Sequence, residues 1–261
     1  MKWSDVVRRL NLPGLLFLLA LAGLWELLID SNAVSYQFLP APSEIGRSAE
    51  RLAASGDLGK NVLHTLAVTL IGWVIAGAIG ISLGVLLASS RRTWGFTMAS
   101  VEVLRSLPAV SFIPVAILIF GFSINMELVV IVFISQWPVL INTIDGVQGV
   151  TPTHRDLARV MRLSRRDRFR KIVLPSAGPS IIVGLQLGLG LALALAIVAE
   201  MLGNPHGIGY ALAAQLSSLQ PANLFAYVVL TGLLGVLLNA AFLGLVNLAF
   251  PGIRTILKER M

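Results

Sequence analysis

The amino-acid sequence predicts an all-α, polytopic membrane protein with six transmembrane helices. Three observations lead to this prediction. Of the 261 residues, 56% are hydrophobic and only 13% are charged, whereas about a quarter of the residues in soluble domains are charged. The mean hydropathy is +0.83. The apolar residues also gather in runs of the length, about 20 residues, that an α-helix needs to cross a bilayer.

Six apolar runs alternate with polar segments. The first resembles the apolar part of a signal peptide, but we expect it to be retained as a transmembrane helix. The other five are expected within residues 61–90, 107–122, 128–144, 172–202 and 223–248. The expected domains are residues 1–29 (N-terminal segment and first span), 30–60 (external loop with an amphipathic helix at 43–54), 61–253 (membrane core, with cytoplasmic helices at 151–174 and an external loop at 203–222) and 254–261 (cytoplasmic tail).

The distribution of Lys and Arg predicts the orientation. With a cytoplasmic N-terminus and six spans, only Arg47, Arg51 and Lys60 of the twenty basic residues lie outside. Such an excess on one side is typical of cytoplasmic loops. The net charge of +7 is therefore explained by topology, and no nucleic-acid partner is expected.

Small residues recur at every fourth position in two of the predicted spans. The two stripes are Ala76, Gly80, Gly84 and Ala88, and Gly184, Gly188, Ala192 and Ala196. Such stripes allow two helix backbones to approach closely, so we predict helix packing here, with a lipid-facing surface as the less favoured alternative. Pro108 and Pro114 are expected to interrupt the third span, and Glu102 and Arg105 are spaced to pair.

Several kinds of chemistry lack the residues that they need. The chain has no cysteine, and His64, His154 and His206 are far apart with no ligand spacing, so neither a metal site nor a catalytic residue is expected. Residues 56–61 resemble a nucleotide-binding loop only in part. The span centres also lack the paired ionisable residues of a proton- or sodium-coupled carrier. We therefore expect no enzyme activity, and any use of ATP requires a partner.

One basic segment interrupts the apolar sequence. Eight of the twenty Lys and Arg lie within residues 155–171. Thr151-Pro152 is a helix start signal, and Ser164 with Asp167 three residues later is a second one. Two short helices with a turn near Arg162 are therefore predicted.

The first of these helices has an apolar face that must be covered. Leu157, Ala158, Val160 and Met161 form this face, and Arg155, Arg159 and Arg162 lie largely opposite. Lipid headgroups can cover such a face, and so can a cytoplasmic protein. The residues alone leave both alternatives open.

The basic segment resembles the EAA loop of binding-protein-dependent ABC transporter permeases. Asp156, Leu157 and Ala158 stand for its Glu-Ala-Ala, and Leu174-Pro175 closes the motif. Between residues 39 and 210 the chain is similar to the taurine, alkanesulfonate and nitrate permease branch. The motifs that carry this similarity include Leu39-Pro-Ala-Pro-Ser43, Pro108-Ala-Val-Ser-Phe-Ile-Pro114, Ala199-Glu200-Met201 and Gly207-Ile-Gly209.

This resemblance implies the transmembrane subunit of an ABC importer with a type I, MetI-like core in the bacterial inner membrane. It implies a homodimer with two ABC ATPase subunits and an external solute-binding protein. The partner ATPase would bind ATP and Mg²⁺, and this chain would hold no cofactor. The solute would be small, such as a sulfonate, taurine or nitrate. Two alternatives are a secondary carrier or uniporter that needs no ATPase, and a membrane scaffold.

The resemblance also implies which residues act. The residues expected to couple to the ATPase are Asp156, Leu157, Ala158, Arg159, Met161, Arg162, Leu163, Ser164 and Pro175. For the transport pathway we expect Pro108, Pro114, Gly184, Gly188 and Glu200, the last near one end of its span.

Arg162 occupies the position of the family's glycine, which ends the first short helix in a left-handed conformation. An arginine with positive φ would cost about 1 kcal/mol. We therefore predict that Arg162 keeps a negative φ and that the first helix runs on by about a residue.

Overall fold

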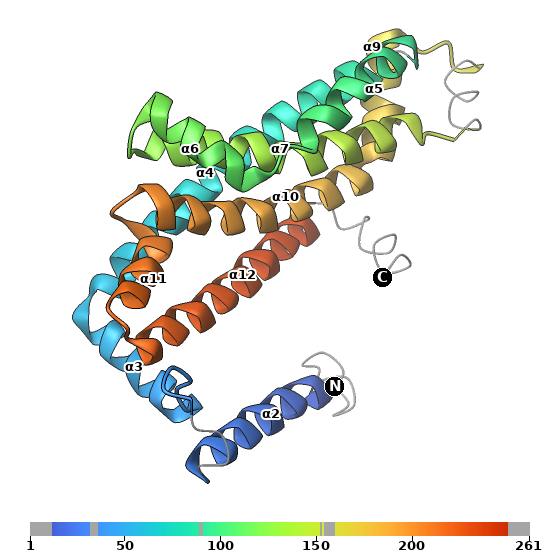
Figure 1. Cartoon of the computed structure of the whole chain (residues 1–261). Helices are drawn as coiled ribbons and strands as arrows, with labels where there is room; N and C mark the ends of the chain where they lie inside the picture. The colour runs from blue at the N-terminus through green and yellow to red at the C-terminus, as the bar shows by residue number, and fades with distance from the viewer. Residues whose placement is uncertain (1–11, 32–35, 89–90, 152, 154–159, 250–261) are drawn as a thin grey trace. The chain divides into compact units, whose positions relative to one another are not determined.

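The computed structural model describes residues 12–31, 36–88, 91–151, 153 and 160–249, and every regular element in these ranges is helical. The prediction of an all-α protein is therefore confirmed. The elements (Figure 1) are α2 (Leu12–Asp30), α3 (Pro42–Ser55), α4 (Asp57–Ala88), α5 (Arg91–Arg105), α6 (Ala109–Phe120), α7 (Ile124–Gln148), α9 (Arg165–Arg168), the π-helix η1 (Phe169–Val173), α10 (Leu174–Gly203), α11 (Gly207–Ser217) and α12 (Pro221–Ala249).

Four stretches of helix in the described residues are long and apolar enough to cross a membrane. They are α4, α7, the continuous helix Arg166–Gly203 and α12. The pair α5 and α6 makes a fifth span if it is counted as one, because its two parts meet at 85°. The helix α2, 19 residues long, occupies the place of the predicted first span. The total of six remains a prediction.

The predicted break in the third span is confirmed, but only one of the two prolines lies at it. Pro108 is the residue before the first turn of α6, with extended backbone (φ −61°, ψ 122°). Pro114 lies inside α6, which continues to Phe120. The expectation that both prolines interrupt the helix was therefore wrong, since a single missing N–H at Pro114 leaves the other helical hydrogen bonds of α6 in place.

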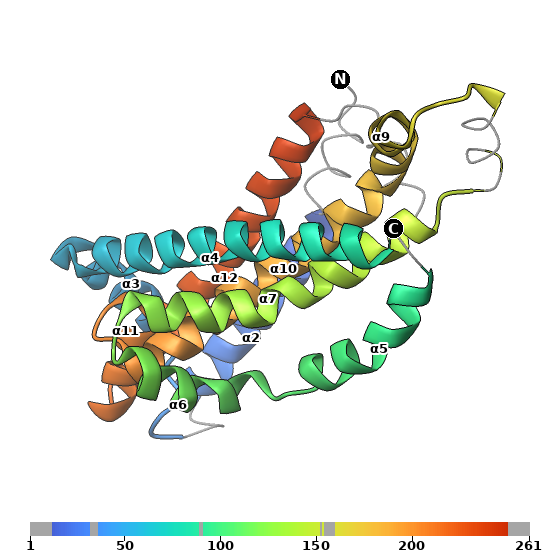
Figure 2. The same cartoon turned by 90° about the horizontal axis from the view of Figure 1, so that it is seen from above.

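The chain divides into two compact units, Met1–Lys60 with Ala211–Thr231 and Asn61–Tyr210 with Gly232–Met261. In the second unit α7 packs between the two small-residue stripes. Gly84 of α4 approaches α7 so closely that a Cβ there would lie 2.6 Å from the Cβ of Thr143. Both views show α4 running beside α7 (Figures 1 and 2).

The stripe of α10 packs against the same helix. A Cβ at Gly184 would lie 2.8 Å from the Cβ of Asn142, and one at Gly188 would lie 3.0 Å from the carbonyl oxygen of Ser135. The packing predicted for both stripes is confirmed, because only glycine leaves room for backbones this close. Trp73 adds a link within this unit, since its Nε1 donates to the carbonyl oxygen of Leu185 at 2.9 Å and its ring meets Phe242 edge to face.

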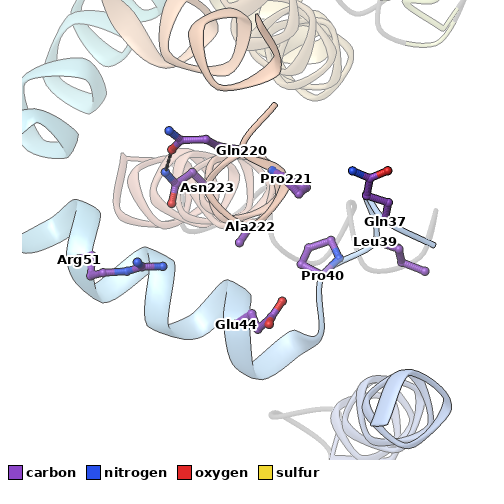
Figure 3. Close-up of a pocket in the computed structure, with 9 residues that line it drawn as sticks. All are labelled: Gln37, Leu39, Pro40, Glu44, Arg51, Gln220, Pro221, Ala222 and Asn223. Carbon is purple, nitrogen blue, oxygen red and sulfur yellow. Dashed lines mark hydrogen bonds between the residues drawn. The ribbon is translucent and has the colours of Figure 1, made fainter. Parts of the chain in front are cut away.

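In the first unit, α3 lies where a short amphipathic helix was predicted, and its buried residues are Ile45 and Ser48. Its external placement remains a prediction. The carboxylate of Glu26 on α2 accepts a hydrogen bond from the Ser43 N–H in the first turn of α3, at 2.9 Å. An open pocket of about 270 Å³ lies in this unit between α3 and the start of α12 (Figure 3). Its lining residues are Gln37, Leu39, Pro40, Glu44, Arg51, Gln220, Pro221, Ala222 and Asn223. One acidic and one basic side chain line this pocket, so its lining has no net charge that would select an anion or a cation.

Candidate functional site

The EAA-like segment, residues 151–175, leads into α10 and ends in its first turn. Asp156, Leu157, Ala158 and Arg159, four of the expected coupling residues, lie outside the described residues. Val160 and Met161 are described, and they are 81% and 60% exposed. Two of the four residues predicted for the apolar face are therefore exposed, and the other two, Leu157 and Ala158, lie outside the described residues.

Arg162 contradicts the prediction made for it. Its φ is +48°, in the left-handed region, and the first short helix ends at Val160 instead of running on. The chain must leave that helix and enter α9 at Arg165 within a few residues, and a left-handed residue makes this turn. Arg162 thus adopts the conformation expected of the family's glycine, at a cost of about 1 kcal/mol.

The second start signal of the segment is confirmed. The Ser164 hydroxyl accepts a hydrogen bond from the backbone N–H of Asp167 at 3.1 Å and donates one to the Asp167 carboxylate at 2.8 Å. Asp167 also lies 3.3 Å from Lys171. These contacts cap the first turn, where a helix has unsatisfied N–H groups.

The second helix of the segment is not a separate element, because it continues into the membrane span. The helix α9 passes into η1 and then into α10 without an interruption. Pro175 has no N–H for the carbonyl oxygen of Lys171, so the α-helical pattern cannot close there. The wider π-turn directly before it instead joins the Leu174 N–H to the carbonyl oxygen of Phe169. Because the helical backbone is continuous, a movement of α9 would be transmitted to α10.

A buried polar cluster lies at the other end of α10, and we define it as His64, Thr65, Glu127, Glu200 and Asn204. The side chains of Glu127 and Glu200 are fully buried. The imidazole Nε2 of His64 lies 3.3 Å from a carboxylate oxygen of Glu127. The side-chain amide of Asn204 donates to the other oxygen of Glu127. Three segments of the chain, in α4, in α7 and at the C-terminal end of α10, thus contribute to one polar site.

Glu200 is held by a separate set of donors. Its Oε2 accepts hydrogen bonds from the Thr65 hydroxyl at 2.9 Å and from the Gly209 N–H at 2.8 Å. The Thr65 hydroxyl in turn accepts one from the Ile208 N–H at 2.9 Å. Thr65 therefore joins α4 to Glu200 and to the first turn of α11.

Two glycines make this arrangement possible. A Cβ at Gly207 or at Gly209 would overlap the Glu200 side chain. Gly207 also has a φ of +96°, which side chains rarely adopt. The motif Gly207-Ile-Gly209 therefore allows the backbone of α11 to reach a buried carboxyl group, and this contact links it to Ala199-Glu200-Met201.

Comparison with known proteins assigns this chain to a protein family. Residues 80–255 match the family described as binding-protein-dependent transport system inner membrane component. This chain belongs to that family of permeases. The expected resemblance is therefore confirmed, and so is the MetI-like fold.

Relatives cover most of the permease. The putative aliphatic sulfonates transport permease protein SsuC of Bacillus subtilis (strain 168) is 29% identical over 229 residues, which cover 88% of this chain and 83% of that protein. SsuC of Escherichia coli (strain K12), named in the same way, is 31% identical over 223 residues, covering 85% and 84%. The nitrate import permease protein NrtB of Leptolyngbya laminosa is 29% identical over 247 residues, covering 91% and 86%.

Two solved structures share the fold of the permease. An inward-facing structure of the MetNI methionine ABC transporter aligns with a TM-score of 0.56 at 20% identity, over 70% of this chain and 94% of that one. An amino acid ABC transporter crystallised with histidines aligns with a TM-score of 0.57 at 16% identity, over 82% and 98%.

The pathway residues expected for the permease are not brought together as one set. Gly184 and Gly188 are buried at the contact between α7 and α10, Glu200 is buried in the polar cluster, and Pro108 and Pro114 are exposed in the described part of the chain. The two glycines thus have a packing role, and the pathway assignment stays a prediction. Glu102 and Arg105 pair as expected, at 2.7 Å, where both side chains are partly exposed.

Sequence reasoning missed most of the polar cluster. His64 and His206, judged to be far apart, lie with ring centroids 5.7 Å apart, so that interpretation was wrong for this pair. Glu127 lies in the first turn of α7, where an acidic residue interacts favourably with the helix dipole. This ordinary explanation left no reason to single it out as a site residue. Of the cluster residues, only Glu200 could be singled out from the sequence, because it is the one charged residue of a long apolar run.

Proposed function

We propose that this permease is the transmembrane subunit of an ATP-driven ABC importer. It works as a homodimer with two ATPase subunits and receives a small solute from an external binding protein. The observation that carries this proposal is the family match over residues 80–255. The partner ATPase binds ATP and Mg²⁺, and this chain contributes no catalytic residue. Both termini of the chain lie in the cytoplasm.

Coupling is mechanical in this proposal. The first short helix of the EAA-like segment, with Asp156, Leu157, Ala158 and Arg159, docks into a groove of the ATPase. The exposure of Val160 and Met161 supports this, because a partner would cover apolar surface that this chain leaves uncovered. Closure of the ATPase pair then moves α9, and the continuous helix through η1 and Pro175 carries the movement into α10 and α7.

The proposed solute is a small anion. Relatives of this permease are named for aliphatic sulfonates, nitrate and bicarbonate, all of which are small anions. A further relative, ThiX of Halalkalibacterium halodurans, is named for formylaminopyrimidine, so a neutral heterocycle belongs in the same trial. Substrate selection rests mainly with the binding protein.

The test is reconstitution of the permease with its ATPase and binding protein in liposomes. We expect ATP hydrolysis to rise when binding protein loaded with a sulfonate, taurine or nitrate is added. Met161→Asp should abolish co-purification with the ATPase, while Met161→Leu, which conserves size and polarity, should leave it unchanged. Solute flux without ATPase would instead support a uniporter. Normal co-purification of the Met161→Asp and Val160→Asp variants would show that lipid covers this face.

A further inference from the structure

The buried polar cluster has the donor atoms of a metal site. One atom each of His64, Glu127 and Glu200 lies within 4.8 Å of the other two. Imidazole nitrogen and carboxylate oxygen are donors that suit divalent first-row transition metals, and zinc sites combine these donors. We propose that His64, Glu127 and Glu200 bind one divalent transition-metal ion, for which Zn²⁺ is the probe.

An unpaired, buried oxygen of Glu200 also favours a cation in this cluster. The Oε1 atom of Glu200 has no hydrogen-bond partner in the described residues, although the side chain is fully buried. The Glu200 carboxyl extends into the cluster, since one of its oxygens is among the atoms that converge with His64 and Glu127. An unpaired buried carboxylate oxygen is costly, and a cation supplies what neighbouring donors do not.

Charge balance strengthens the argument. Two buried carboxylates lie close together here, and among the described residues His64 is the one basic side chain within bonding distance of Glu127. Repulsion between two carboxylates in a water-poor site disfavours the form with both ionised. A divalent ion bound between them would balance both negative charges.

The ion can reach the site, and a fourth ligand is near. The side chain of His64 is 17% exposed, so the cluster is not sealed on that side. His206 is exposed, and its ring centroid lies 5.7 Å from that of His64. Either His206 or a water molecule completes the four-coordinate geometry that Zn²⁺ prefers.

The surroundings hold the ligands in place. Thr65 and the Gly209 N–H both donate to Oε2 of Glu200, and Asn204 donates to Glu127. Such contacts orient metal ligands in the way that outer-shell partners usually do. The bound ion would tie the ends of α4, α7 and α10 together at the end of α10 remote from the EAA-like segment.

The test measures zinc in the full-length permease purified in detergent. We expect one Zn²⁺ per chain after dialysis against micromolar free Zn²⁺, and a rise in Tm that is reversed by a chelator. Glu127→Gln, Glu200→Gln and His64→Gln should each lower the affinity for Zn²⁺ at least about 10-fold. Glu102→Gln, which removes a carboxylate from a partly exposed ion pair, is the matched control and should bind zinc normally.

Two results would overturn the proposal. Equal zinc affinity in all four variants would place the ion elsewhere, for example on His154. No zinc in the folded wild-type chain, together with a higher Tm for Glu200→Gln, would mean that the two carboxyl groups share a proton instead. If Glu127→Gln and Glu200→Gln both fail to fold, His64→Gln at the partly exposed rim still decides between these outcomes.

Discussion

The two ends of α10 are built in opposite ways. At its N-terminal end the EAA-like segment is basic and local in the chain, and its described residues from Val160 to Val173 are exposed or partly exposed. At its C-terminal end, about 45 Å away for a helix of 30 residues, the polar cluster is largely buried and assembled from three segments more than 60 positions apart. The exposed end suits a partner that docks and leaves. The buried end suits a contact that stays intact while the rest of the helix is displaced.

This comparison predicts that the buried end tolerates substitution far less than the exposed end. The largest effect is expected for Gly209→Val, because added atoms would overlap the Glu200 side chain and the backbone of α10. We expect a loss of about 3 kcal/mol or more in stability, followed by thermal unfolding in detergent. Gly190→Ala, in the same α10 but with open space at its Cβ, should be neutral or slightly stabilising. Similar losses for both variants would contradict this account of the buried end.

A smaller loss is expected for Thr65→Val, which keeps the shape and removes the hydroxyl. Glu200 and the Ile208 N–H then each lose a partner in a buried site. We expect a destabilisation of about 2–3 kcal/mol. Thr69→Val, one turn along α4, is the control, because the buried Thr69 hydroxyl has no partner among the described residues. Equal destabilisation by both substitutions would show that volume and not hydrogen bonding holds the cluster.

The smallest effect, and one of opposite sign, is expected at the exposed end. Arg162→Gly should stabilise the chain by about 1 kcal/mol, because glycine adopts a positive φ without strain. Arg166→Gly, inside α9, should instead destabilise by about 1 kcal/mol. Thermal unfolding of the two variants side by side measures this difference. A loss of stability in Arg162→Gly would mean that the arginine side chain makes contacts that outweigh the backbone strain.

Local pattern in the sequence predicted a large part of this protein. The apolar runs predicted the helices, the stripes at Gly80–Gly84 and Gly184–Gly188 predicted close helix packing, and Ser164 with Asp167 predicted a helix start. Each of these signals works within a few turns of one helix, where periodicity and capping are physical properties of the chain itself. The resemblance of the basic segment to the EAA loop predicted the protein family.

Tertiary structure alone decided the rest. The φ of Arg162 depends on where α9 must begin, and local strain was the wrong guide because the turn between the two helices outweighs about 1 kcal/mol. The polar cluster depends on contacts such as that between Thr65 and Glu200, which are 135 positions apart. No local period reports such a contact, because the burial of a charged side chain is a property of the packed helices and not of the segment that carries it.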